Sequence, residues 1–507
     1  MMGVVRRLPL GAMLLVAVIP YESLAPFSGM FPLWHAHRAA LVAVLVVLLV
    51  AFVLRRFGCS PAKASVVAAI PVLTFQFVQP DLLFSPVIPT FAGLIALFAA
   101  AIDSARRYEN ANIALTAMGA VLLVGTASPL VQSTPDRQLV DIAPDMAPLG
   151  AAGGINLASR PSIIHIVLDG YGATEPLADI YGHDTAPFFA QLEQRGFVVI
   201  ENALVPYSQT LPSMASVMSG GPVNMTDDRG DANRLRADLG YTIRNAPVPA
   251  VLEASGYTFA RAESGYDYVD FGGARDVTRS QIKVTLFDTL LLRAFGDFFG
   301  PVHNRILKDA LRPGTLDDLP QPFFYYQHLL APHPPFTIAA DGSPRQSKGF
   351  TYVDGSHFIA GKREMRENYI EGYREKASFI ETAVLSQIDA FPAGPRIVII
   401  HGDHGPGAYL DHENAERTCM GERLQTFVAV YSDVPGVSRR LLSTGDERFS
   451  TVNIYRAVLS ALMETEFPLV AATSQFLQWS DPTAMVRVDA RDIALPCNAA
   501  IHAELGN

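Results

Sequence analysis

The feature that most constrains the fold is a series of apolar runs in the first quarter of the chain. Each run is close to the roughly 17–25 residues that a membrane-spanning helix needs once its interfacial flanks are added. The five runs cover positions 8–28, 39–54, 64–78, 87–102 and 113–131. Half of the 507 residues are apolar and 17% are charged, as expected of a chain that lies partly in lipid. We therefore predict an N-terminal α-helical transmembrane bundle of about five spans.

Basic residues indicate on which side of the membrane the chain continues. They cluster before the first run, between the second and third, and between the fourth and fifth, as the positive-inside rule expects of cytoplasmic loops. The clusters are Arg6 and Arg7; Arg55, Arg56 and Lys63; and Arg106 and Arg107. An odd number of spans that starts in the cytoplasm predicts a multi-pass protein of a bacterial-type inner (plasma) membrane, with its large domain on the periplasmic or extracellular side.

A cleaved signal peptide is the alternative for the first run, because Arg6 and Arg7 precede an apolar stretch as they would in such a peptide. Cleavage would leave four spans, and the large domain would still lie on the periplasmic or extracellular side. No Ala-x-Ala-like site follows closely, which favours an uncleaved anchor.

The charge of the chain is unevenly distributed. Up to Ser133 there are eight Lys or Arg against four Asp or Glu, and the remainder holds 31 against 45. An acidic domain excludes a nucleic-acid binder that relies on a basic surface, and three cysteines exclude a disulfide scaffold. Cys419 and Cys497 both lie in a predicted oxidising compartment, and the sequence leaves open whether they are bridged.

The segment after the last apolar run reads as a linker, because residues 132–161 are rich in Pro, Ala and Gly. The predicted organisation is a transmembrane helical region at 1–132, a linker at 133–160 and an extracytoplasmic domain at 161–507. Within that domain short apolar runs alternate with helical stretches, which is typical of α/β layers.

Polar side chains follow three of the short apolar runs, which read as buried strands. These runs are 163–168 before Asp169, 323–330 before His333, and 396–400 before Asp403 and His404. Ligands of open α/β sheets bind beyond the carboxyl ends of the strands. We therefore expect the four polar side chains to converge.

A fourth element supplies a hydroxyl group. Pro212 suits a first helical turn and Gly220 a helix end, so Thr210 is predicted at or just before a helix N-terminus, where a phosphate or sulfate is favoured. A hydroxyl is a weak nucleophile until a base or a metal removes its proton. Asp169, Asp403 and His404 are suitable ligands for a divalent cation that would lower the pKa of the Thr210 hydroxyl and hold a substrate oxygen.

Four segments carry a resemblance to a known family. They are Ile164–Gly172 (IHIVLDGYG), Ser208–Ser213 (SQTLPS), Ala331–Phe336 (APHPPF) and Gly402–Gly405 (GDHG). With the N-terminal membrane region, the chain resembles over its whole length the sulfatase-like membrane proteins of the alkaline phosphatase superfamily, which include lipoteichoic acid synthases and phosphoethanolamine transferases. The resemblance implies an alkaline phosphatase-like α/β domain with a mixed sheet between helical layers.

The resemblance also implies roles for individual residues. Asp169, Asp403 and His404 match the metal ligands of the family, and Thr210 matches the nucleophile, which also touches the metal. His333 matches a histidine near the transferred group. His412, eight residues after His404, could stand in for a further substrate-binding histidine of the phosphoethanolamine transferases, although the spacing differs.

One divalent metal ion (Zn, Mn, Mg or Ca) is expected rather than two. Two-metal relatives need a further Asp with two His, and the stretch 323–332 contains no Asp. His328 and His401 are expected to point back into the strand ends, packed or hydrogen-bonded to the backbone.

The chain also departs from the sulfatase pattern. Sulfatases carry C/S-x-P-x-R, whereas here Thr210 occupies the first position and Met214 the position of the Arg. We therefore predict a membrane-anchored, metal-dependent phosphotransferase or phosphoesterase that acts on phospholipid or other envelope phosphate esters, with no nucleic-acid partner. A sulfuric-ester hydrolase of the same fold is one alternative, and a degenerate, non-catalytic membrane-tethered module is the other.

Overall fold

The computed structural model describes most of the chain. The described residues are 9–24, 33–68, 105–132, 138–141, 160–225, 232–266, 268–271, 274–277, 296–312, 316–346, 352–443, 448–463, 465–494 and 497. The chain divides into two compact units, one built mainly from residues 1–136 and the other from most of residues 137–507. Each unit is described by itself.

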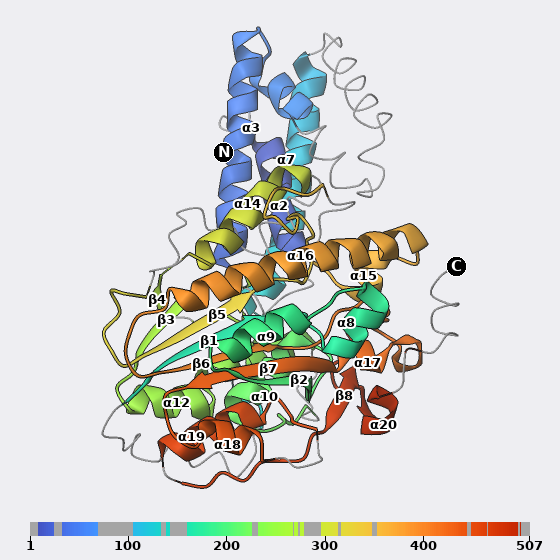
Figure 1. The fold of residues 1–507 in the computed structure, drawn as a ribbon. Helices are drawn as coiled ribbons and strands as arrows, with labels where there is room; N and C mark the ends of the chain where they lie inside the picture. Colours follow the sequence, from blue (N-terminus) through green and yellow to red (C-terminus); the bar gives the residue numbers. More distant parts are fainter. Residues whose placement is uncertain are drawn as a thin grey trace. The chain divides into compact units, whose positions relative to one another are not determined.

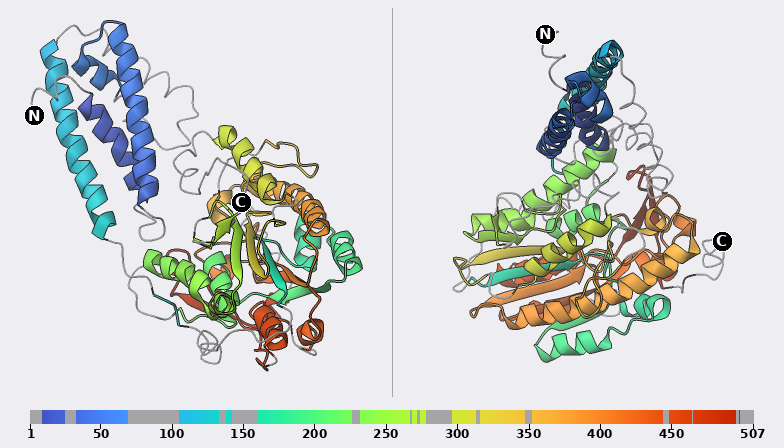
Figure 2. Two further views of the ribbon diagram at one scale, coloured as in Figure 1. Left: turned by 90° about the vertical axis from the view of Figure 1, so that its left-hand side faces the viewer. Right: turned by 90° about the horizontal axis from the view of Figure 1, so that it is seen from above.

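The first unit is helical. Helix α2 (Leu10–Leu24) packs against α3 (Trp34–Arg56) and α7 (Ala105–Gln132), and Figure 2 shows the three side by side. Large apolar side chains on α3 and α7 are exposed, with Phe52 at 61% and Val121 at 72%. Such faces are unfavourable in water and are suited to lipid.

Two helices of the described residues are long and apolar enough to cross a membrane, Ala36–Arg56 and Arg107–Ser128, rather than the five expected. The first expected span forms a shorter apolar helix over Leu10–Glu22. The third expected span is described only as far as residue 68, and the fourth lies outside the described residues. Among the described residues the structure therefore shows two apolar helices of spanning length, not five.

The second unit is built on a seven-stranded mixed sheet with the strand order β2-β7-β6-β1-β5-β3-β4. Strand β7 runs antiparallel to its neighbours β6 and β2, and the other pairings are parallel. A separate antiparallel pair is formed by β8 and β9. The strands are β1 Ser162–Leu168, β2 Val198–Leu204, β3 Thr258–Ala262, β4 Arg275–Asp276, β5 Phe323–Leu329, β6 Arg396–Gly402, β7 Gln425–Ser432, β8 Ser474–Leu477 and β9 Met485–Val488.

Helices cover both faces of this sheet, as expected of an alkaline phosphatase-like α/β domain. Helices α8, α9, α14 and α16 contribute to the core on one face, and α10, α12 and α19 lie on the other (Figure 1). The helices are α8 Thr174–Tyr181, α9 Ala186–Gln194, α10 Thr210–Ser219, α11 Ala232–Asn245, α12 Pro247–Ala254, α14 Gly296–Ala310, α15 Gly355–Ile359, α16 Arg363–Asp389, α17 Met420–Arg423, α18 Val437–Leu441, α19 Asn453–Leu462 and α20 Ala490–Ile493, with a 3₁₀ turn at Ala415–Arg417.

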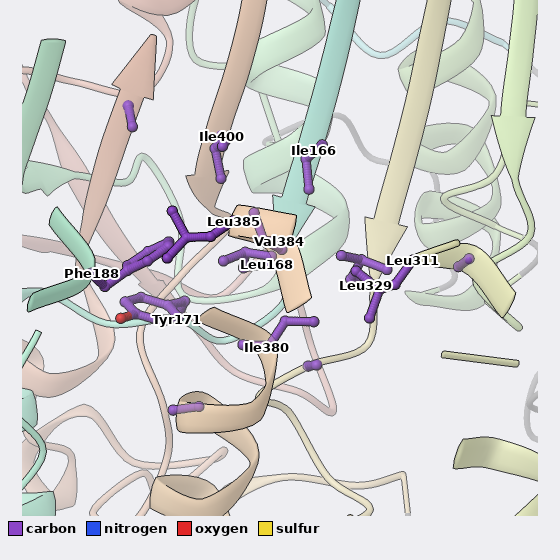
Figure 3. Packing of buried hydrophobic residues seen from close by; sticks show 14 of the residues in the cluster. Ile166, Leu168, Tyr171, Phe188, Leu311, Leu329, Ile380, Val384, Leu385 and Ile400 are labelled. Carbon is purple, nitrogen blue, oxygen red and sulfur yellow. The ribbon is translucent and has the colours of Figure 1, made fainter. Parts of the chain in front are cut away.

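The central strands are apolar throughout because both of their faces are covered. Every residue of β1 is buried. Ile166 and Leu168 pack on the face covered by α16, whose Ile380 and Val384 belong to the same core (Figure 3). Burial of one such side chain contributes about 1.5–3 kcal/mol, so the central strands and the loops that follow them have a rigid base.

Cys419 and Cys497 form a disulfide, which answers the question that the sequence left open. The bond joins the residue before α17 to the C-terminal part of the chain.

Candidate active site and metal centre

The carboxyl ends of β1 and β6 meet at a pair of buried aspartates. Asp169 follows β1 and Asp403 follows β6, and neither side chain reaches solvent. The Oδ1 atom of Asp403 accepts hydrogen bonds from the backbone N–H of Gly170, at 2.9 Å, and of His404, at 3.0 Å. Asp403 thus ties the ends of the two strands together.

The glycines around this pair are required by close packing. A Cβ atom at Gly402 would overlap the carbonyl oxygen of Tyr171, and one at Gly405 would overlap that of Glu422. The Gly-Asp-His-Gly sequence therefore lets the loop lie against neighbouring backbone and hold its two polar side chains in place.

Two carboxylate oxygens at this edge are buried and lack a hydrogen-bond partner among the described residues, Oδ1 of Asp169 and Oδ2 of Asp403. His404 Nε2 lies 3.9 Å from the first and 3.3 Å from the second. Because His404 Nδ1 lies 2.9 Å from the carbonyl oxygen of Gly405, Nδ1 carries the proton and Nε2 presents its lone pair. Three lone-pair donors facing one another fit a cation, which would satisfy all of them.

Electrostatics favour the protonation states that bind a metal. Burial and the nearby Arg423 charge lower the pKa of His404, so its imidazole is neutral near pH 7. Burial alone would raise the pKa of Asp169, but His333, His328 and His404 outweigh it and lower that pKa, so the carboxylate is ionised.

Thr210 lies at this cluster. Helix α10 begins at Thr210 and ends before Gly220, whose φ is +65°, as the Pro and Gly signals predict. The Thr210 Oγ1 atom lies 3.0 Å from His404 Nε2, so the hydroxyl donates to that lone pair. Ser213 Oγ donates to the carbonyl oxygen of Asp403 at 2.6 Å, which fixes the first turn of α10 against the Gly402–Gly405 loop.

His328 is a correction to the sequence analysis. Its Nε2 atom lies 2.9 Å from Asp169 Oδ2, so the side chain reaches the cluster instead of pointing back into the strand. The reason is the parallel register, in which Val167 pairs with His328. Burial by itself would lower the pKa of His328, but the Asp169 carboxylate outweighs it and raises that pKa. Asp169, His328 and Asp403 offer ligand atoms within 4.8 Å of one another.

His401, in contrast, lies inside the sheet as expected. Its Nδ1 atom is 2.8 Å from the carbonyl oxygen of Gly402, and its Nε2 atom is 2.8 Å from His165 Nε2.

His333 lies on the loop after β5. Its backbone N–H donates to the carbonyl oxygen of Asp169 at 3.0 Å, which holds the loop beside the cluster. Its Nδ1 atom lies 3.0 Å from the carbonyl oxygen of Pro334, so Nε2 is the atom left for a substrate. Lys376, which is fully buried, donates to the carbonyl oxygens of Leu330 and His333, both at 2.6 Å. Burial lowers the pKa of Lys376 to about 7.

The sequence analysis missed two further residues of the site, Asp354 and Arg423. Asp354 Oδ2 lies 2.6 Å from Arg423 Nη1, and Arg423 Nη2 lies 3.3 Å from His404 Nε2. Asp354 Oδ2 is also 3.9 Å from His333 Nε2. Burial would raise the pKa of Asp354, but the charges of Arg423 and His333 outweigh it and lower that pKa. Neither residue stands in a recognisable motif, so no sequence signal points to this pair.

His412 is buried beside Asp354. Its Nε2 atom is 3.2 Å from the carbonyl oxygen of Asp354, and its ring stacks on His357 at 4.5 Å. Trp479 lies at its edge, with ring centroids 5.7 Å apart. Burial lowers the pKa of His412 to about 3, so this imidazole is neutral. The structure thus connects His412 to the site through Asp354.

Comparison with known proteins gives one sequence match. The family model described as Sulfatase matches residues 161–426, which contain every candidate residue named above. No curated protein sequence matches the chain.

Several solved structures are similar. The C-terminal periplasmic domain of EcEptC from Escherichia coli, in complex with Zn, shares 12% identity at a TM-score of 0.42, covering 71% of this chain and 98% of that one. Lipooligosaccharide phosphoethanolamine transferase A (EptA) from Neisseria meningitidis, an integral membrane protein, shares 14% identity at a TM-score of 0.38, covering 89% of this chain and 95% of that one. A sulfatase structure from Bacteroides thetaiotaomicron shares 16% identity at a TM-score of 0.39, covering 63% of this chain and 78% of that one. All three TM-scores lie below 0.5, so the family assignment depends on the sequence match.

Proposed function

Because the chain belongs to the sulfatase family of the alkaline phosphatase superfamily, we propose that it is a membrane-anchored, metal-dependent phosphotransferase or phosphoesterase acting on envelope or lipid-linked phosphate esters. The observation that carries this proposal is the position of the Thr210 hydroxyl, 3.0 Å from His404 Nε2, beside two buried carboxylate oxygens that have no hydrogen-bond partner in the described part of the chain. Such a cluster suits a metal-activated hydroxyl nucleophile.

Asp169, Asp403 and His404 would hold one divalent cation, with Thr210 as a further ligand. Two carboxylate oxygens and one imidazole nitrogen form a donor set that Zn or Mn accepts readily, and Mg or Ca less so. His328 would orient Asp169 through its 2.9 Å contact with the other carboxylate oxygen. When bound, the cation would lower the pKa of the Thr210 hydroxyl and neutralise charge on the transferred group.

The reaction would proceed in two steps through the protein's own groups. First, Thr210 Oγ1, after its hydroxyl releases its proton to solvent, forms a bond to phosphorus while the bond from phosphorus to the leaving oxygen breaks, which gives a phospho-Thr. A sugar or polymer hydroxyl, or water, then attacks this phosphorus and releases Thr210, whose oxygen takes a proton back from solvent. His333 Nε2 would give a proton to the leaving oxygen and take one from the entering oxygen. His412, linked to Asp354, would contact a more distant part of the substrate.

Thr210 and Met214 favour phosphoryl over sulfuryl chemistry. Thr cannot be oxidised to formylglycine as Cys or Ser can, and Met214 supplies no charge where the sulfatase motif has an Arg. The sulfuric-ester hydrolase remains the second candidate, since the family match itself is to sulfatases.

Paired chromogenic substrates test this choice. The metal-loaded full chain would be assayed with bis(p-nitrophenyl) phosphate, p-nitrophenyl phosphate and p-nitrophenyl sulfate, before and after removal of the metal with a chelator. We expect metal-dependent turnover of a phosphate ester. Turnover of the sulfate alone, or formylglycine at Ser213 by mass spectrometry, would favour the sulfatase, and inactivity on all three would favour a non-catalytic module.

We further propose that the protein spans a bacterial-type plasma membrane with residues 1–132, followed by a linker to residue 160 and a periplasmic or extracellular catalytic domain at 161–507. The exposed apolar faces of α3 and α7 and the Cys419–Cys497 disulfide support this arrangement. A reporter that is active only in the periplasm, fused after Ser133, should be active. Activity of a cytoplasm-only reporter at the same junction would show that the catalytic domain lies on the cytoplasmic side, contrary to this proposal.

A further inference from the structure

The arginine next to the candidate nucleophile has a geometry that the proposed reaction does not yet use. Arg423 is buried, with 3% of its surface exposed. Its Nε atom donates to the carbonyl oxygen of Ser208 at 2.8 Å, and Nη1 donates to Asp354 Oδ2 at 2.6 Å and to the carbonyl oxygen of Gly405 at 3.0 Å. Three fixed acceptors therefore hold the guanidinium plane in one orientation.

The remaining nitrogen, Nη2, is directed at the reacting end of the site. It lies 3.3 Å from His404 Nε2, the atom that Thr210 Oγ1 also contacts. That nitrogen has a single lone pair, which can serve only one partner well. Once a cation or the Thr210 hydroxyl occupies the lone pair, the Nη2 hydrogens are available to an acceptor brought in beside Thr210.

The negative charges around the site make a positively charged donor favourable. Asp169, Asp403 and Asp354 are buried carboxylates, so an anionic phosphate ester approaches Thr210 favourably only where positive charge compensates them. A guanidinium is permanently charged, and its planar donors match the oxygens of a phosphate. In the sulfatase motif an Arg stands four residues after the nucleophile, where this chain has the buried Met214.

We propose that Arg423 is a catalytic residue whose Nη2 donates a hydrogen bond to a non-bridging oxygen of the transferred group, and so replaces from α17 the charge that Met214 lacks. This inference rests on the proposed function, since it assigns a residue to that same reaction. The hydrogen bond from Arg423 strengthens as negative charge develops on the non-bridging oxygens of the transferred group. Loss of this hydrogen bond should therefore lower kcat more than it changes KM.

The direct test compares Arg423→Lys with Arg456→Lys. Lysine keeps a positive charge beside Asp354, but its single nitrogen cannot hold Asp354 and reach the substrate together. Arg456 on α19 is also buried, and it donates to the carbonyl oxygens of Gly220, at 2.5 Å, and Pro468, at 2.7 Å, neither of which belongs to the site. With bis(p-nitrophenyl) phosphate we expect kcat to fall about 10²- to 10³-fold in Arg423→Lys, with KM changed only a few-fold and bound metal unchanged. Arg456→Lys should stay near wild type.

A second measurement does not depend on turnover. Inorganic phosphate carries more negative charge on its oxygens than the diester substrate, so it reports the stronger interaction that Arg423 is expected to make in the transition state. Calorimetric titration of the metal-loaded full chain with inorganic phosphate should give a Kd about 10- to 100-fold weaker in Arg423→Lys than in Arg456→Lys, as expected when a charged hydrogen bond is lost. If the wild type turns over no phosphate ester but this difference in Kd is found, the proposed reaction fails and the anion-binding role of Arg423 stands. Equal phosphate affinity in the two lysine variants would overturn the inference.

Loss of Arg423 alone leaves Asp354 buried without its partner, which can unfold the domain. The double variant Asp354→Asn/Arg423→Gln removes both charges together and keeps polar groups at both positions. It should fold and show the same weakening of phosphate binding relative to Arg456→Lys. Phosphate affinity equal to that of Arg456→Lys in the folded double variant would also overturn the inference.

Discussion

Two groups of polar side chains lie on the central strands β1 and β6 or just beyond their carboxyl ends, and only one of them has polar atoms without a hydrogen-bond partner among the described residues. The inner histidine pair consists of His165 and His401, whose Nε2 atoms are 2.8 Å apart, with Tyr455 OH 2.8 Å from His165 Nδ1. The carboxylate cluster consists of Asp169, Asp403 and His404, which follow these strands, and Thr210 at the start of α10; two of its carboxylate oxygens lack partners among the described residues.

The two groups differ in whether their hydrogen bonds are satisfied, which is the property that we use to distinguish a structural polar group from a functional one. Each nitrogen of the inner histidine pair has a partner, since His401 Nδ1 bonds the carbonyl oxygen of Gly402. Such a closed group stabilises the sheet, whereas the carboxylate cluster concentrates acceptors that lack a partner among the described residues and that a cation or a substrate would satisfy. Changes in the cluster should therefore act on chemistry and changes in the pair on stability.

The largest expected effect is at Thr210. Thr210→Ala removes the attacking oxygen, so turnover of bis(p-nitrophenyl) phosphate should fall by about 10³-fold or more, while bound metal is largely retained. Thr210→Ser keeps a hydroxyl and should keep part of the activity. Ser216→Ala is the matched control, because Ser216 is on the same helix and its hydroxyl bonds the carbonyl oxygen of Pro212. Near wild-type turnover in Thr210→Ala would refute covalent catalysis by this residue.

The second effect concerns the metal. Asp403→Asn or His404→Ala should remove most of the bound divalent cation, because each deletes a ligand at the cluster. His401→Gln, three residues before His404, should keep its metal, since His401 belongs to the inner histidine pair. Elemental analysis of the purified full chain measures the stoichiometry. An unchanged metal content in both cluster variants would show that these residues are not ligands.

The third effect concerns the inner histidine pair, where a substitution should lower stability and leave the metal in place. His165→Phe leaves His401 Nε2 and the Tyr455 hydroxyl buried without a partner, which should cost about 1–3 kcal/mol for each orphaned group. Urea unfolding of the full chain in detergent measures the loss, with metal content as the control. A variant that loses its metal while remaining as stable as wild type would contradict the division between the two groups.

The smallest effect is the pH dependence of stability. Burial, with the charges of His401 and His328, holds the pKa of His165 well below 6.5 in the folded protein. The unfolded chain therefore binds a proton on His165 that the folded chain does not, and stability falls as the pH falls below about 6.5. His165→Gln should remove a slope of about 1.4 kcal/mol per pH unit in this range. An identical acid slope in the variant and the wild type would show that His165 does not titrate this way.

Much of the site was predictable because its signals are local. Asp169, Asp403 and His404 each follow an apolar strand directly, and Thr210 stands between strand and helix with Pro212 and Gly220 as markers. Chain order and the rule for strand ends were enough to expect their convergence.

The residues that were missed depend on long-range pairing. His328 reaches Asp169 only through the register of β1 against β5, which an apolar run does not reveal. Asp354 and Arg423 are 69 positions apart and pair through the packing of α17 beside the Gly402–Gly405 loop. Neither their spacing nor their neighbours carry a pattern, so only the three-dimensional structure identifies them.

The covalent role of Thr210 can be measured directly by trapping the intermediate. The metal-loaded full chain would be mixed with bis(p-nitrophenyl) phosphate, quenched with acid at short times, digested and mapped by mass spectrometry. We predict a phosphoryl adduct on the peptide that contains Thr210, assigned to that residue by fragmentation and missing from Thr210→Ala. An adduct on a different residue, or turnover with Thr210 unmodified at every quench time, would contradict the proposal that Thr210 is the nucleophile.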